Sequence, residues 1–174
     1  MILLDPDLHL APPPPSTAAK QISAANSRQL RLPTPRTFAR FLAIAQLAVR
    51  LRGQVTVLLT TDQAIRSLNR RFRGKNKATD VLSFPADATL HGPEKIAGDL
   101  AISVPTALRQ AIEQGHSLST EIKVLILHGL LHLAGHDHET DTGQMARRER
   151  LLRARLRLPQ GLIERAAAPK ARRP

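Results

Sequence analysis

The feature that most constrains the fold is the stretch from Ser119 to Ala134, which is apolar over most of its length and ends just before Gly135. Its length and composition predict a helix, and a helix with so much apolar surface must be buried by the rest of the chain. His128 and His132 lie in its second half. We therefore expect a histidine-bearing helix near the centre of the molecule.

The other predicted elements are short strands and helices. Alternation of apolar and polar residues, or a short apolar run, predicts strands at residues 1–10, 54–60, 81–84 and 96–103. Helical periodicity predicts helices at residues 37–52, 62–72, 105–114 and 141–157. This order predicts an α+β fold, in which a small mixed β-sheet is covered by helices.

Several helix ends carry signals of their own. Thr37 and Asp62 are the side chains expected to cap the first two helices. Gly53 is expected to end the first helix, because glycine adopts the left-handed conformation found there. Pro105 fits the first turn of the helix at 105–114.

The chain is expected to form one domain, residues 1–158, followed by a basic, disordered tail at 159–174. Residues 11–35 are rich in proline and are predicted to be a mobile connection. No apolar run approaches the roughly 20 residues of a membrane helix. Asp5 and Asp7 stand where a secretion signal needs basic residues. We therefore expect a cytoplasmic protein with no membrane partner.

Composition limits the chemistry in two ways. Because the chain has no cysteine, thiolate zinc sites are excluded, and a metal would have to be held by histidine, carboxylate or water. The net charge of +12 favours a polyanionic partner, nucleic acid before an anionic membrane. With four Phe and no Trp or Tyr, phosphate contacts by Lys and Arg would have to dominate over base stacking.

Four of the seven histidines fall in the segment HGLLHLAGHDH, residues 128–138. In a helix, His128 and His132 lie one turn apart on one face, where two imidazoles can reach a single ion. Gly135 can adopt a positive φ and end the helix, after which His138 can supply a third ligand. Three imidazoles leave one tetrahedral position open, as in catalytic zinc sites. We expect these three histidines to bind one zinc ion.

The same spacing occurs in zinc peptidases of the pattern HExxHxxGxxH, but Gly129 stands where their general-base glutamate would be. A peptidase is therefore the weaker interpretation. We interpret Gly129 as a position that lets a bulky substrate approach the metal. His136 is expected at the surface. Asp137 is expected either to orient a ligand histidine or to cap a turn.

A basic loop follows the predicted helix at residues 62–72. The segment LNRRFRGKNKATDVLSF, residues 68–84, contains the basic side chains of Arg70, Arg71, Arg73, Lys75 and Lys77. Most of these are interpreted as solvated charges. Arg73 differs because it follows Phe72, whose expected burial would fix the backbone and allow the guanidinium to clamp a phosphate.

At these segments the chain resembles the YbeY-type rRNA maturation factors, a family of bacterial metal-dependent endoribonucleases specific for single strands. The resemblance rests on LNRRFRGKNKATDVLSFP, on GDLAIS at 98–103 and on HGLLHLAGHDH, and it covers most of residues 37–157. Asn76 and Ala78 stand where Asp and Pro are expected, and His136 where Tyr is frequent. None of these departures touches the ligand set.

The resemblance implies that His128, His132 and His138 are zinc ligands and that Arg73 is important for RNA processing. It also implies roles in 16S rRNA 3′-end maturation and in the quality control of defective ribosomes. The implied partners are single-stranded RNA, chiefly rRNA, and ribosomal subunits. Nothing carries over to the Pro-rich segment or to the basic tail.

These expectations suggest a mechanism. Zinc bound through His128 can polarise a phosphate oxygen and acidify water, and Arg73 would stabilise charge in the transition state. His128 and Arg73 are therefore the expected catalytic residues. The nucleophile is either water or the 2′-OH of the RNA, and Asp99 and Asp137 are candidates for the general base.

Two other functions stay open at this point. One is another zinc hydrolase, such as the peptidase considered above. The other is a non-catalytic ribosome assembly factor that zinc stabilises, because binding without cleavage would use the same basic surface.

Overall fold

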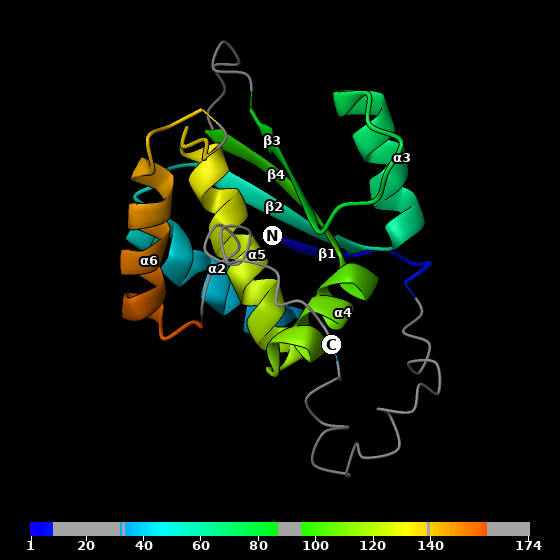
Figure 1. Ribbon diagram of the computed structural model, residues 1–174, viewed down its shortest axis with the longest axis horizontal. Coiled ribbons are helices and arrows are strands. Elements are labelled where there is room, and N and C mark those ends of the chain that lie inside the picture. The colour runs from blue at the N-terminus through cyan, green and yellow to red at the C-terminus, as the bar shows by residue number, and fades with distance from the viewer. Residues whose placement is uncertain (9–31, 33, 87–94, 139, 160–174) are drawn as a thin grey trace, which may run out of the picture.

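The computed structural model describes residues 1–8, 32, 34–86, 95–138 and 140–159 (Figure 1). Most of the predicted mobile connection and of the predicted tail lies outside these residues. None of the helices in the described ranges is long and apolar enough to cross a membrane. In chain order the elements are β1 (Ile2–Leu4), α2 (Pro35–Val49), β2 (Gln54–Thr60), α3 (Asp62–Arg73), β3 (Val81–Pro85), β4 (Ile96–Ser103), α4 (Val104–Gln114), α5 (Leu118–Leu133) and α6 (Gln144–Leu156). Each predicted helix and strand has a counterpart, and the α+β class is confirmed.

The described strands form one mixed sheet in the order β1-β2-β4-β3. β1, β2 and β4 are parallel, whereas β3 runs antiparallel to β4. Because side chains alternate between the faces of a sheet, Leu100 of β4 and its partner Ser83 of β3 face α5. Ala101 and Phe84 face α3 instead, in a smaller apolar cluster. The sheet therefore has α5 and α2 on one side and α3 on the other (Figure 1).

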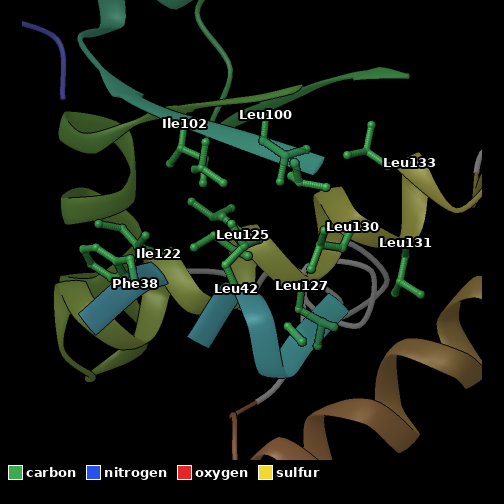
Figure 2. Close-up of a cluster of buried hydrophobic side chains, with 14 of the residues drawn as sticks. Phe38, Leu42, Leu100, Ile102, Ile122, Leu125, Leu127, Leu130, Leu131 and Leu133 are labelled. Carbon is green, nitrogen blue, oxygen red and sulfur yellow. The ribbon is translucent and has the colours of Figure 1, made fainter. Parts of the chain in front are cut away.

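α5 lies at the centre of the main core, where twelve of its sixteen residues are buried. Figure 2 shows Leu125 between Leu100 and Ile102 of β4 on one side and Leu42 of α2 on the other. Burying one such side chain contributes about 1.5–3 kcal/mol to the stability of the fold. The predicted central histidine-bearing helix is confirmed.

Two glycines occupy positions where a side chain would collide with its neighbours, Gly129 between α5 and the sheet and Gly98 between β4 and β3. A Cβ on Gly129 of α5 would lie 2.7 Å from Leu100 Cδ2 and 3.3 Å from Ser83 Oγ. A Cβ on Gly98 of β4 would lie 2.4 Å from the carbonyl oxygen of Phe84. Gly129 therefore serves helix–sheet packing, and the interpretation that it makes room for a substrate is wrong.

The ends of α2 differ from the predicted ones. The helix begins at Pro35, after Thr34, rather than at Thr37, because proline suits the first turn. It ends at Arg50, which adopts the left-handed conformation with a φ of 66°, before Gly53 is reached. The glycine signal was therefore three residues too late.

The N-terminal cap of α3 also differs. The capping side chain is Thr61, whose hydroxyl accepts from the N–H of Ala64 at 3.2 Å. Asp62, the expected cap, instead joins α3 to α4: its carboxylate accepts from Thr106 Oγ1 at 2.7 Å and from Arg109 Nη1 at 3.0 Å. The side chain of Asp62 therefore makes a tertiary contact with α4 and does not cap α3 as the local sequence had predicted.

Replacing Gly98 with alanine should lower the free energy of unfolding by about 3 kcal/mol or more. The φ of 142° is unfavourable for a side chain, and the new Cβ would collide with the backbone of β3. Gly115→Ala is the matched control, because its φ of 68° is also positive but nothing lies within 4 Å of the new Cβ. That control should lose only about 1–2 kcal/mol. Urea denaturation measures both losses, and equal losses would contradict the close contact.

Candidate metal centre

α5 and the turn after it bring three histidines together. His128 and His132 stand one turn apart near the C-terminal end of α5, so both rings leave the helix on the same side. Gly135 has the expected positive φ, 86°, and its N–H donates to the carbonyl of His132 at 2.9 Å. This helix end turns the chain back and carries His138 to the other two rings.

The three imidazole rings form a nearly equilateral group. Their centroids are 4.8 Å apart for His128 and His132, and each of these is 5.2 Å from His138. One nitrogen from each ring lies within 4.8 Å of the other two, and the Nε2 atoms of His128 and His132 are 3.1 Å apart. A tetrahedral ion that binds imidazoles at about 2.0–2.1 Å holds their nitrogens roughly 3.4 Å apart. The donor set and its spacing therefore fit one such ion.

A buried carboxylate determines which nitrogen of His128 is free. Glu149 of α6 is 1% exposed, and its Oε1 lies 3.2 Å from His128 Nδ1. Because a carboxylate accepts hydrogen bonds, Nδ1 carries the hydrogen and donates it. The lone pair of His128 is then on Nε2, the nitrogen that faces His132.

His132 is held in its neutral form near neutral pH. Burial, reinforced by the neighbouring His128 and His138 and opposed by the nearby Asp137, lowers the pKa of His132 to about 4. A neutral imidazole is the form that binds a metal, so near neutral pH the His132 ring needs no net loss of a proton before binding.

Exposure increases across the group. His128 is 5% exposed, His132 is half-buried, and His138 lies at the surface. One side of the group is therefore buried in the core and the other is open to solvent. Structural zinc sites are closed by four protein ligands, whereas catalytic sites keep a position open. Among the described residues the group offers three ligands and one exposed side, as a catalytic site does.

Two aspartates hold the turn between α5 and α6. The carbonyl of Asp137 accepts from the N–H of Asp141 at 2.9 Å, and its carboxylate accepts from Thr140 Oγ1 at 3.1 Å. Asp141 accepts from the N–H groups of Met145 and Gly143, each at 2.7 Å, and these bonds lower its pKa. Asp137 thus has the turn role that was one of its two expected roles. Asp141 caps α6 from outside, so the helix begins after it.

Arg73 is the last residue of α3 and is exposed. The burial predicted for Phe72 is wrong, because this residue is 57% exposed. Its ring packs edge-on against Phe84 of β3, with 5.1 Å between centroids. The loop that follows is held by Asn69, whose Nδ2 donates to the carbonyl of Lys77 at 2.7 Å. Arg73 therefore stands on an ordered helix end, but on the α3 side of the sheet.

The remaining candidate residues do not join the histidine group. Asp99 is exposed and pairs with Phe84, on the face of the sheet opposite to its neighbour Leu100 and to α5. The sheet therefore separates Asp99 from the three histidines. His136 is half-buried and lies outside the three-histidine group in the described part of the chain.

Fold and site together define a class: α+β proteins in which a buried helix and the turn after it present three histidines that can bind one metal ion. The family model described as endoribonuclease YbeY matches residues 20–157. The chain belongs to the endoribonuclease YbeY family. This confirms the resemblance noted from the sequence.

Individual relatives agree with the family model. The endoribonuclease YbeY of Koribacter versatilis is 55% identical over 129 residues, 74% of this chain and 82% of the relative. That of Solibacter usitatus is 52% identical, over 71% of this chain and 84% of the relative. A protein of the same name from Helicobacter pylori, strain Shi470, is 42% identical over 72% and 89%. The matched share of each relative exceeds four fifths.

Sequence reasoning missed Glu149. A signal for it exists: Met145, Glu149 and Leu152 fall on one stripe of α6 at helical spacing, and all three are buried. An acidic residue between apolar residues on the buried face of a helix indicates a buried partner. The partner, His128, is distant in sequence and is identified only by the fold.

One zinc ion per chain should bind to the purified protein, and alanine at His128, His132 or His138 should abolish stoichiometric binding, because each removal leaves two ligands. His136→Ala is the matched control, since it removes a histidine of the same turn that lies outside the group. Metal content after dialysis, measured by mass spectrometry, checks this. A full zinc complement in any of the three variants would contradict the ligand set.

Proposed function

We propose that the chain is a zinc-dependent endoribonuclease that cuts single-stranded RNA. Support comes from its family and from relatives named endoribonuclease YbeY. The observation that carries the metal part of the proposal is the three-histidine group, with one nitrogen of each ring within 4.8 Å of the others. The charge of +12 supports a polyanionic substrate.

His128, His132 and His138 would hold the ion, and because imidazole binds a metal as a neutral ligand the ion would keep its full charge. A bound zinc ion supplies Lewis acidity, which polarises a phosphoryl oxygen and acidifies water. Because His138 is exposed and His128 is not, substrate would reach the centre from the His138 side. This open side is what a phosphodiester in a flexible strand needs.

Arg73 would bind a phosphate of the same strand. It stands at the end of α3, which Phe72 and Phe84 attach to the edge strand β3. Ser83, the residue before Phe84, faces α5 and lies 3.5 Å from the carbonyl of Gly129. An RNA strand that contacts both Arg73 and the three histidines would therefore run along the edge of the sheet formed by β3. A separated single strand can follow such a bend more readily than a stiff A-form duplex.

The peptidase interpretation loses further support from the packing of Gly129. A general-base glutamate at this position would point at Leu100 and Ser83 of the sheet, where even a Cβ has no room. We infer that peptide hydrolysis of the HExxH type is not the activity.

The natural substrate that we propose is rRNA, with action at the 3′ end of 16S rRNA and in the quality control of ribosomes. This part of the proposal follows from the family resemblance of the three motif segments. It implies ribosomal subunits as partners in the cytoplasm. A transcript that spans the 3′ end of 16S rRNA is therefore the first substrate to test.

The zinc-bound protein should cut a labelled single-stranded RNA, leave the matched duplex intact, and lose activity in a chelator. His132→Ala should lower cleavage by at least about 1,000-fold, since it removes the metal, whereas His136→Ala should retain it. Gel analysis of cleavage checks both, and a 2′,3′-cyclic phosphate on the product would identify the 2′-OH as the nucleophile. A folded, zinc-containing protein that binds ribosomal subunits but cuts nothing would instead establish the assembly-factor alternative.

Arg73→Ala should lower kcat/KM for RNA cleavage by roughly 10- to 100-fold, about 1.4–2.7 kcal/mol, with normal zinc content, because it removes a charge-assisted phosphate contact. Arg147→Ala on α6 is the control for net charge, since Arg147 is also exposed. Steady-state kinetics at fixed salt distinguish the two. Equal effects of both substitutions would mean that Arg73 acts only through overall charge.

A further inference from the structure

Glu149 is a buried acidic residue with an unusually limited set of partners. It is 1% exposed and lies on the buried face of α6, together with Met145, Leu152 and Arg153. Its Oε1 lies 3.2 Å from Nδ1 of His128. Its Oε2 is buried and has no hydrogen-bond partner among the described residues. The hydrogen bond to His128 is therefore the interaction around which this carboxylate is placed.

Burial of this carboxylate is unfavourable beside a neutral ring. A carboxylate that leaves water loses strong hydration, and one hydrogen bond from a neutral imidazole replaces only part of it. The balance improves if the imidazole carries positive charge, as it does in part when a dication binds its other nitrogen. That other nitrogen is Nε2 of His128, which faces the ring of His132. The arrangement is thus favourable with a metal present and costly without one.

The chain contains a second buried pair that serves as an internal comparison. Glu121, in the first turn of α5, is fully buried, and its Oε2 lies 3.0 Å from Nε2 of His116. This pair has the same residue types and a similar distance, but His116 precedes α5 and does not belong to the three-histidine group. Glu121 joins the start of the helix to the preceding turn, whereas Glu149 reaches a proposed metal ligand near its end.

We propose that Glu149 is a positioning residue for the metal. Its carboxylate holds the hydrogen of His128 on Nδ1, so that the lone pair on Nε2 faces the ion, and its negative charge makes that nitrogen a stronger donor. The inference rests on the metal site of the proposed function. It adds α6 to the site, because α6 would set the orientation of a ligand that α5 carries.

Two variants separate the hydrogen bond from the charge. Glu149→Ala removes both and should weaken zinc binding by about 10- to 100-fold. Glu149→Gln has the same shape and keeps an acceptor oxygen, so its zinc affinity should fall less than that of the alanine variant. Glu121→Gln, the matched control on the second pair, should bind zinc as tightly as the wild type. Competition with a chromophoric zinc chelator measures the four affinities.

A second readout reports on the ring itself. In the zinc-free wild type, ¹⁵N chemical shifts of the His128 side chain should show the hydrogen on Nδ1, and Glu149→Ala should give a mixture of both tautomers. A merely structural role for Glu149 would lower the melting temperature of zinc-free protein but change neither the tautomer nor the affinity. Zinc affinities within twofold of the wild type in folded Glu149→Ala and Glu149→Gln proteins would overturn the proposal.

The outcomes also separate this inference from the proposed function. A wild type that binds zinc but cuts no RNA would refute the proposed activity, while weaker zinc binding by the Glu149 variants would still support the positioning role. A wild type that binds zinc and cuts RNA, with unchanged affinity in both Glu149 variants, would refute the positioning role alone. A wild type that binds no zinc would overturn both.

Discussion

Contact between α5 and the sheet is the interaction on which the rest of the structure depends. α5 is buried on nearly every side, so β4, α2 and the following turn are all placed relative to it. Gly129 packs against the side chains of Leu100 and Ser83 with no space for a Cβ, and the side chain of Leu133 in α5 packs over Gly98. Because interiors pack tightly, a helix held in this way has little freedom to rotate or slide. The packing of α5 in the core, and not the turn that follows the helix, therefore determines where the rings of His128 and His132 point.

Electrostatic interactions add to packing in preparing the three histidines to bind a metal. The group combines a rigid part, two rings on a buried helix, with an adjustable part, one ring on a turn held by Asp137 and Asp141. Burial keeps His132 neutral, and Glu149 orients His128 from a helix distant in sequence. Preorganisation of this kind lowers the reorganisation that accompanies binding or catalysis. The exposed third ring leaves the group accessible.

Local sequence was sufficient for the elements and for the histidine group, because both depend on spacing within one helix and one turn. The positive φ of Gly135 and the gathering of the rings follow from that spacing. Local sequence was insufficient where a contact with a residue distant in the chain determines the role of a side chain. Asp62 looked like a helix cap but binds α4, Phe72 looked buried but lies over an edge strand, and Glu149 looked like one charge in a basic helix. Periodicity identifies which residues face inward and cannot name what they meet.

The register of β3 has a consequence for how such a chain can evolve. Ser83 touches the histidine-bearing helix, and its neighbour Phe84 touches the end of the arginine-bearing helix, on opposite faces. Adding or deleting one residue within β3 would exchange these faces, and a deletion before Ser83 would place Phe84 against Gly129. A change of length in β3 therefore disrupts both contacts at once, whereas a single substitution alters one of them. We therefore expect the length of β3 to vary less among related proteins than the identity of its residues.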